Sequence, residues 1–133
     1  MASYDFEVRI AYADTDRMGV VYYANYLVLF ERGRTEYLRS VGLRYRDLED
    51  DAHLFMPVVE AHCEYFAPAR YDDLIRVRTF LGKVGSASIE FRHEIFRAES
   101  GEKIAAGYTR HAVVGKTWKV IRMPEFLRQK LEK

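Results

Sequence analysis

Two aspartates and a glycine stand directly ahead of a long amphipathic segment in this sequence. Asp14 and Asp16 precede Gly19, and the amphipathic segment begins at about residue 24. The N-terminus of a helix exposes unpaired backbone N–H groups and the positive end of the peptide dipole, which can polarise a carbonyl oxygen or stabilise an oxyanion. A carboxylate held beside such donors is sufficient apparatus for acyl transfer.

The segment 24–41 is predicted to be the helix that supplies these donors. Its apolar residues recur at helical spacing, and Gly42 follows as a terminator. Arg32 and Glu36 are spaced to form an outward-facing ion pair across one turn. The sequence therefore predicts one long helix with one charged face.

Two features of this predicted helix indicate how other parts of the chain pack around it. Val28 and Leu29 widen the apolar face beyond a simple stripe, which predicts that the helix is covered on more than one side, as a wrapped sheet would cover it. Gly33 costs a helix about 1 kcal/mol relative to alanine, so a close contact with another backbone is expected there.

The remaining sequence is dominated by strand patterns. Phe6, Val8, Ile10 and Tyr12 alternate with other residues, which is the period of a strand with one buried face. Successive strand runs joined by short turns predict an antiparallel meander. The expected strands are 6–12, 56–66, 74–81, 88–96 and 104–114, with short helices at about 45–50 and 124–133. The predicted fold class is α+β, with a strongly curved antiparallel sheet of about five strands around one long helix.

Length and composition restrict the function classes. The 133 residues fit a single domain, 1–133, and the net charge of +1 offers no global attraction to nucleic acid. No leader or membrane-spanning run is evident, so a cytoplasmic protein is expected. Cys63 is the only cysteine, which excludes an internal disulfide and a multi-thiolate zinc site. His53, His93 and His111 have no ligand-like partners, and we assign no metal. Ten tyrosines and eight phenylalanines favour broad packed surfaces such as subunit contacts.

The motif around the two aspartates resembles the signature of hotdog-fold acyl-CoA thioesterases, in particular the 4-hydroxybenzoyl-CoA thioesterase and Tol-Pal-associated group. The resemblance covers nearly the whole chain. It implies a helix wrapped by a curved antiparallel sheet, a homo-oligomer that is a dimer or a dimer of dimers, active sites at the dimer interface, and an acyl-CoA substrate with no further cofactor. The residues that carry it are Asp14-Thr15-Asp16, Gly19-Val20-Val21-Tyr22, Ala24-Asn25-Tyr26-Leu27, Phe30-Glu31, Arg34-Thr35-Glu36 and Ala67-Pro68-Ala69-Arg70-Tyr71-Asp72-Asp73.

The resemblance also implies roles for particular residues. Asp16 stands at the position of the family's catalytic carboxylate, and the backbone N–H that polarises the thioester carbonyl falls on Tyr23. Relatives in the Tol-Pal-associated branch carry histidine at that position, so only the main chain of Tyr23 is implicated. Asp16 is either a nucleophile that forms a mixed anhydride or a general base that deprotonates water. Because aspartate also favours turns and caps, a structural role is the alternative for both Asp14 and Asp16, and Asp14 is interpreted as structural.

Three further residues are candidates near the substrate, each with an alternative. Asn25 either caps the helix or holds a water or a carbonyl group near Asp16. Glu31 matches a position that carries an aspartate near the aromatic end of the substrate in the hydroxybenzoyl enzyme, so it is an acyl-pocket candidate or a solvated or subunit-bridging residue. His62 either lines the pocket or is a structural histidine.

Coenzyme A carries phosphates, which need local positive charge or backbone donors. Lys83, Ser86 and Ser88 cluster around one turn, with Arg110 and Lys116 on or after a neighbouring strand. These residues are candidate phosphate ligands, and solvated surface is the alternative.

Three functions compete for this sequence. The first is hydrolysis of an acyl-CoA thioester to the free acid and CoA. The second is a hotdog hydratase or dehydratase, which would use a histidine and an acid, although the matching loop has no such histidine. The third is a non-catalytic module that binds acyl-CoA or an acyl carrier. The acyl group itself is not predicted. Aromatic residues that could bound its pocket are Tyr22, Tyr26, Phe30 and Phe66.

Overall fold

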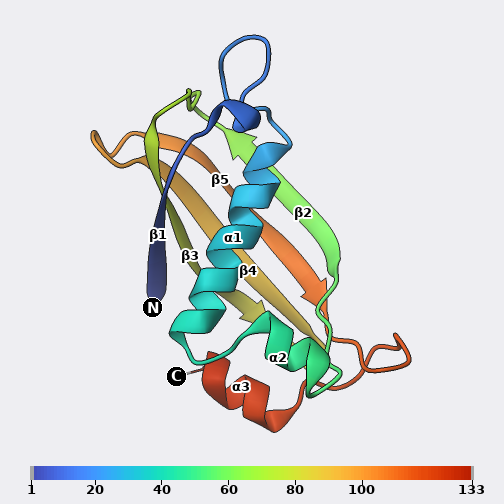
Figure 1. Ribbon diagram of the computed structural model, residues 1–133. Helices are drawn as coiled ribbons and strands as arrows, with labels where there is room; N and C mark the ends of the chain where they lie inside the picture. The colour runs from blue at the N-terminus through green and yellow to red at the C-terminus, as the bar shows by residue number, and fades with distance from the viewer. Residues whose placement is uncertain (1, 133) are drawn as a thin grey trace.

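The computed structural model describes residues 2–132 and shows an antiparallel sheet curved around one long helix (Figure 1). The α+β class and the number of strands are as predicted from the sequence. None of the helices within the described residues is long and apolar enough to cross a bilayer. The elements are β1 (Ser3–Arg9), a 3₁₀ turn η1 (Tyr12–Asp14), α1 (Asn25–Ser40), α2 (Tyr45–Asp50), β2 (Val58–Tyr65), β3 (Leu74–Val84), β4 (Ser88–Arg97), β5 (Lys103–Ala112) and α3 (Glu125–Leu131).

The order of strands in the sheet is β1-β3-β4-β5-β2, and all neighbours are antiparallel. Only β3, β4 and β5 form the predicted meander. The expectation that β2 would continue it is wrong, because β2 pairs with β5, with Tyr65 opposite Ala105. Pro68 cannot donate a ladder hydrogen bond, and residues 66–73 instead carry the chain from the edge formed by β2 toward β3. This crossing segment passes the start of α1, where Arg70 bridges to Val20.

The inner face of the sheet follows the alternation seen in the sequence. Ile75, Val77 and Thr79 of β3 are buried on the face toward the helix. The first strand has the expected length but begins and ends three residues earlier than the predicted 6–12, since it ends at Arg9 and Tyr12 lies in the 3₁₀ turn. The Tyr12 ring stacks on Tyr71 of the crossing segment with 4.0 Å between ring centroids. This stack replaces strand pairing and begins the loop that leads to α1.

Helix α1 is slightly shorter than the predicted 24–41 and is followed by Gly42 in the left-handed region, at φ 87°. The predicted ion pair between Arg32 and Glu36 is wrong. Glu36 pairs with Arg39, and the Arg32 guanidinium lies 5.1 Å from the ring centre of Phe6 on β1, a favourable cation–π position. Arg32 therefore lies over the Phe6 ring of β1, and Glu36 pairs with Arg39, one turn later in the helix.

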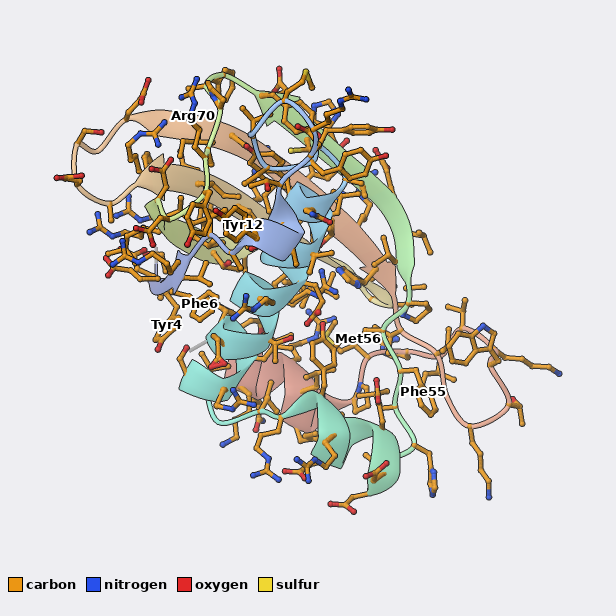
Figure 2. The ribbon with its side chains drawn as sticks, turned by 45° about the horizontal axis from the view of Figure 1, so that its top comes forward. Tyr4, Phe6, Tyr12, Phe55, Met56 and Arg70 are labelled. Atoms are coloured by element: carbon orange, nitrogen blue, oxygen red, sulfur yellow. The ribbon has the colours of Figure 1, made fainter. Side chains whose placement is uncertain are left out.

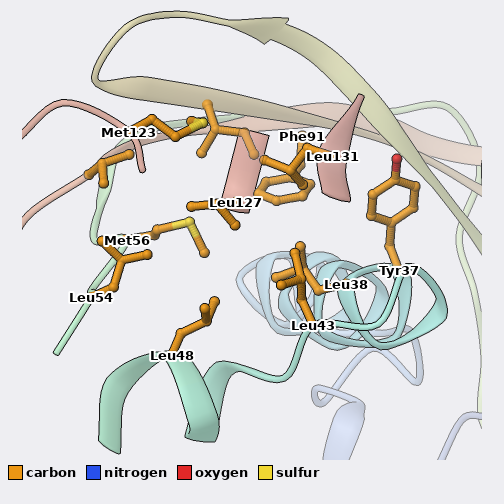
Figure 3. Close-up of a cluster of buried hydrophobic side chains, with 12 residues drawn as sticks. Tyr37, Leu38, Leu43, Leu48, Leu54, Met56, Phe91, Met123, Leu127 and Leu131 are labelled. Carbon is orange, nitrogen blue, oxygen red and sulfur yellow. The ribbon is translucent and has the colours of Figure 1, made fainter. Parts of the chain in front are cut away.

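The sheet of this chain covers only part of the apolar face of α1. Leu29 is buried, whereas Leu27 and Val28 stay exposed. Beneath the helix the core falls into two clusters, one of which underlies the loop ahead of α1. The other packs the C-terminal half of α1 against α2, α3 and the sheet (Figure 3), and its residues include Tyr37, Leu38, Leu43, Leu48, Leu54, Met56, Phe91, Met123, Leu127 and Leu131.

Gly33 is the point of closest approach between α1 and β3. A Cβ atom added there would lie 2.7 Å from Thr79 Oγ1 and 2.7 Å from Val77 Cγ1. We expect Gly33→Ala to lower the free energy of unfolding by about 1 kcal/mol, since an overpacking cost of about 2 kcal/mol exceeds the helix preference of alanine, about 1 kcal/mol. Denaturant unfolding measures the change. Arg39→Ala, which removes only an exposed ion pair, should cost no more than about 0.5 kcal/mol, and equal stability of Gly33→Ala and wild type would contradict the close packing.

Candidate functional site

A cavity of about 370 Å³ lies beside the N-terminus of α1. The loop before the helix, the first turn of the helix, the end of β2 and the crossing segment all contribute to its walls, which are mostly apolar. The two residues that the sequence assigns to catalysis, Asp16 and Tyr23, both line it. The full lining is Asp16, Met18, Val20, Val21, Tyr23, Tyr26, Tyr65, Phe66, Ala67 and Pro68.

The loop geometry orients the half-buried Asp16. Its backbone N–H donates to the Val20 carbonyl at 2.9 Å, and its own carbonyl accepts from Gly19 N–H at 2.9 Å. Gly19 has φ 81°, a left-handed conformation that suits glycine in a tight turn. Met18 N–H then donates to Asp16 Oδ1 at 2.8 Å. Within residues 2–132 no donor is bound to Asp16 Oδ2, so one carboxylate oxygen remains available to a ligand.

Further hydrogen bonds fix this loop to its surroundings. Val21 N–H donates to the Ala69 carbonyl at 2.8 Å, which attaches the loop to the crossing segment. Asn25 Nδ2 donates to the Asp14 carbonyl at 3.0 Å, so Asn25 holds a backbone carbonyl two residues from Asp16 and does not cap the helix with its side chain. The Asp14 carboxylate accepts from Ala11 N–H at 2.8 Å, a turn-stabilising role that agrees with the structural interpretation.

The start of α1 carries the expected backbone donors. Ala24 precedes the helix without a side-chain cap, and within residues 2–132 neither Tyr23 N–H nor Ala24 N–H has an acceptor. The Tyr23 carbonyl accepts from the Tyr65 hydroxyl at 2.9 Å. Partial burial and the neighbouring Cys63 thiol raise the pKa of Tyr65 to about 12, so the hydroxyl remains protonated and donates. Tyr65 thereby fixes the peptide that precedes the first turn.

Aromatic rings form the apolar wall of the cavity. Tyr26 is almost fully buried, and its ring meets the Tyr65 ring edge-on at 5.2 Å. Of the aromatic residues proposed from the sequence, Tyr26 and Phe66 line the cavity. Phe30 instead lies in the core against His93, and Tyr22 is not in the lining. The sequence analysis missed Tyr65, although the alternation of β2 places Cys63 and Tyr65 on one face.

Two other candidate residues lie away from this cavity. Glu31 is exposed, accepts from the Thr35 hydroxyl at 2.8 Å and lines a second cavity of about 390 Å³. It lies eight residues beyond Tyr23, about 12 Å along the helix. His62 alternates with the inward-facing Cys63 and points to the outer face of the sheet, where it stacks on Tyr108 at 5.3 Å. His62 therefore does not line the Asp16 cavity of its own chain.

Three of the five candidate phosphate ligands are brought together, but at the opposite end of the sheet, and neither Ser86 nor Lys116 joins them. Lys83, Ser88 and Arg110 line a cavity of about 370 Å³ with Glu90. Ser86 is absent from that lining, and its carbonyl accepts from Met123 N–H at 2.7 Å.

The direction of β2 separates this cavity from Asp16. Tyr65, beside Asp16, pairs with Ala105, whereas Val58 at the other end of β2 pairs with His111. Seven residues of extended strand separate the two ends by about 20 Å. Lys83, Ser88 and Arg110 therefore do not share the Asp16 cavity of their own chain.

A buried polar network crosses the core under α1. Arg34, only 8% exposed, donates to the Tyr45 hydroxyl at 2.9 Å and to the Thr109 hydroxyl at 3.3 Å. His111 bonds to Thr109 Oγ1 at 2.9 Å, and the fully buried His93 bonds to Thr79 Oγ1 at 2.9 Å. Burial and the nearby guanidinium lower the pKa of His93 to about 3, and burial lowers that of His111 to about 4. Among the described residues, no cluster of three potential ligands is arranged to hold a metal.

The two histidines predict a pH dependence of stability. Because their folded-state pKa values lie below the ordinary 6.5, the unfolded chain binds more protons as the pH falls below 6.5. The contribution of the two neutral histidines to the free energy of unfolding should be fully present above pH 6.5. It should fall by on the order of 2 kcal/mol per histidine by pH 4.5. Urea unfolding at several pH values tests this. His93→Gln should flatten the slope and the exposed-site control His62→Gln should keep it, whereas identical slopes for wild type and His93→Gln would refute the prediction.

The geometry supports one kind of chemistry. A carbonyl oxygen directed at the free N–H groups of Tyr23 and Ala24 would be polarised by them and by the helix dipole. Asp16 lines the same cavity and offers a free carboxylate oxygen for attack or proton abstraction. A carboxylate, backbone donors and an apolar wall together can perform acyl transfer.

Comparisons with known proteins agree with this chemistry. The family model described as Thioesterase-like superfamily matches residues 10–131. The Acyl-CoA thioesterase YbgC of Haemophilus influenzae is 40% identical over 94 residues, which cover 71% of this chain and 69% of that protein. A DHNA-CoA thioesterase from Staphylococcus aureus superposes with a TM-score of 0.91 at 30% identity, covering 99% of this chain and 88% of that chain. A 4-hydroxybenzoyl-CoA thioesterase superposes at 0.87 with 20% identity, covering 97% and 98%, which shows the fold alone. The expected hotdog fold is confirmed.

Proposed function

Because this chain belongs to the Thioesterase-like superfamily, we propose that it hydrolyses acyl-CoA thioesters to the free acid and coenzyme A. The observation that carries the proposal is that Asp16 and Tyr23 line one cavity and that, within residues 2–132, one carboxylate oxygen of Asp16 and the backbone N–H of Tyr23 have no partner. The names of the relatives, which include acyl-CoA thioesterases, support the same substrate class.

In the proposed mechanism, the thioester carbonyl oxygen accepts a hydrogen bond from Tyr23 N–H. Asp16 Oδ2 attacks the carbonyl carbon, and the C–S bond breaks to release the CoA thiolate and leave a mixed anhydride, which water then hydrolyses. Alternatively, Asp16 takes a proton from water, and the resulting hydroxide attacks the same carbon. In both routes the developing oxyanion is stabilised by the donors at the start of α1.

The cavity lining favours hydrolysis over the hydratase alternative. A hotdog hydratase or dehydratase would need a histidine beside the acid, and no histidine is among the residues that line the Asp16 cavity. The binding-module alternative needs only the cavity, so a measurement of turnover has to separate it from the enzyme.

Asp16→Asn tests the catalytic assignment. We expect at least a hundredfold loss of thiol release from acyl-CoA substrates, about 3 kcal/mol of transition-state stabilisation, because an amide neither attacks nor takes the proton. Asp14→Asn is the matched control. It keeps an oxygen for Ala11 N–H, so turnover should stay within a few-fold of wild type. Full turnover by Asp16→Asn would show that another residue is catalytic. Binding of acyl-CoA without turnover by the wild type would favour the non-catalytic binding module. A panel of acyl chain lengths in the same assay would identify the acyl group.

The surface next to the cavity supports a homodimer. Strand β2 is an edge strand with β5 as its one neighbour in the sheet, and an open edge is a template for pairing with another chain. Exposed apolar side chains lie along it and on the uncovered face of α1, a combination typical of subunit contacts. They are Leu27, Val28, Val58, Val59, Tyr65 and Phe66.

We propose that two copies pair through β2 in antiparallel orientation about a two-fold axis, as a dimer or within a dimer of dimers. Such pairing exchanges the ends of the strand. The Tyr65 end beside Asp16 of one subunit then meets the Val58 end of its partner. Glu31, on the uncovered side of α1, stays a candidate for the acyl pocket across this interface. Lys83 and Ser88 stay candidates for the CoA phosphates.

Val59→Lys tests the interface, because it places a charge on an exposed apolar position of β2. We expect the protein to shift from dimer to monomer in sedimentation equilibrium and to lose at least tenfold in turnover, since the site needs both copies. Tyr4→Lys, on the other edge strand β1, should change neither. A fully active monomer would disprove the shared site.

A cytoplasmic location and the absence of a further cofactor stay predictions.

A further inference from the structure

The hairpin that follows β5 presents an unusual tryptophan. Val114 bridges to Val120, and Gly115 N–H donates to the Lys119 carbonyl at 3.1 Å, which closes a tight turn. Trp118 in this turn has φ 64° and is 62% exposed. A bulky residue rarely adopts that conformation.

Phe55 underpins this tryptophan. The two ring centroids are 5.4 Å apart, and Phe55 pairs with Val114 at the base of the hairpin (Figure 2). The hairpin projects from the end of the molecule that carries α2 and α3 (Figure 1). The indole is therefore supported by Phe55 and remains accessible.

Positive charge surrounds the tryptophan. Lys116, Lys119 and Arg122 are exposed, and within residues 2–132 none of them has an ion-pair partner. The segment 113–124 contains no acidic residue, although the whole chain is nearly neutral. Met123 N–H donates to the Ser86 carbonyl, which places Arg122 next to the turn between β3 and β4.

An aromatic ring amid unpaired cations matches the chemistry of a phosphorylated nucleoside. Bases stack on exposed aromatic side chains, and lysine and arginine bind phosphate oxygens. We propose that Trp118, together with Lys116, Lys119 and Arg122, binds the phosphorylated adenosine end of coenzyme A. This rests on the proposed thioesterase function, which supplies a ligand with both an adenine and several phosphates.

The hairpin serves the active site of the other subunit. Trp118 lies beyond the Val58 end of β2, whereas Asp16 of the same chain lies beside Tyr65 at the opposite end. Antiparallel pairing of two β2 strands brings the hairpin of one copy alongside the Asp16 cavity of its partner. One subunit holds the nucleotide while the other cleaves the thioester.

Trp118 is the only tryptophan of the chain, so its intrinsic fluorescence reports on this site directly. We expect saturable quenching when the full-length protein is titrated with adenosine 3′,5′-bisphosphate or with coenzyme A. The double variant Lys116→Ala/Lys119→Ala should weaken the apparent Kd at least tenfold, because two phosphate partners are lost. Lys130→Ala, which removes an exposed charge on α3, should leave the Kd unchanged.

Kinetics provide a second measurement that does not depend on fluorescence. Trp118→Ala should raise the ratio of KM for an acyl-CoA to KM for the matching acyl-pantetheine at least tenfold, since acyl-pantetheine lacks the nucleotide. Circular dichroism confirms that the variant folds, and Trp118→Phe should recover part of the ratio because it restores a stacking ring.

The possible outcomes separate this proposal from the proposed function. Wild-type hydrolysis of acyl-CoA without quenching by the bisphosphate, and with an unchanged KM ratio in Trp118→Ala, would overturn the nucleotide site and leave the thioesterase. Quenching without hydrolysis would overturn the thioesterase and support the nucleotide site. Quenching by phosphatidylglycerol vesicles but not by the bisphosphate would identify a membrane contact and overturn the proposal. A concentration-dependent shift of the emission without nucleotide, with no response to the bisphosphate, would identify a contact between copies and overturn it as well.

Discussion

The candidate site depends on the attachment of the loop before α1 to the segment that crosses from β2 to β3. Val21 N–H bonds to the Ala69 carbonyl, and Val20 bridges to Arg70. These bonds join two parts of the chain that are nearly fifty residues apart and that form opposite walls of one cavity. If they broke, Asp16 would keep its own turn, but the wall formed by Phe66 would no longer face it. The geometry of the candidate site is therefore set by backbone pairing.

Two contacts of α1 fix the position of the free backbone N–H groups at its start. Close packing at Gly33 fixes α1 against β3, and the Tyr65 hydroxyl fixes the Tyr23 carbonyl. Helix α1 therefore begins beside the cavity as an element anchored along its length, and within residues 2–132 the N–H groups just ahead of it have no acceptor. The position of the N–H groups at the start of α1 is therefore set in part by packing at Gly33, nearly three helical turns away.

Local patterns in the sequence predicted the elements well. The alternation around Val77 located its strand, and helical spacing with Gly42 located α1 to within one residue at each end. The resemblance pointed to Asp16. The partner of β2 was not predictable, because strand pairing is a long-range choice on which local alternation is silent. The distance between Lys83 and Asp16 was not predictable for the same reason. The chemistry of lysine makes Lys83 a candidate phosphate ligand, but strand pairing places it at the far end of the sheet. The shape of a turn likewise gave no hint that Trp118 would stand exposed.

The buried Arg34 has a consequence for how this sequence can change. Its guanidinium donates to the hydroxyl groups of Tyr45 and Thr109, and His93 and His111 are also buried. Removing either hydroxyl alone would strand a permanent cation in a low-dielectric interior, whereas exchanging the arginine and its partners together for apolar residues would not. Substitutions at these positions are therefore epistatic: the fitness of each depends on the others, and divergence through this part of the core must proceed by linked changes.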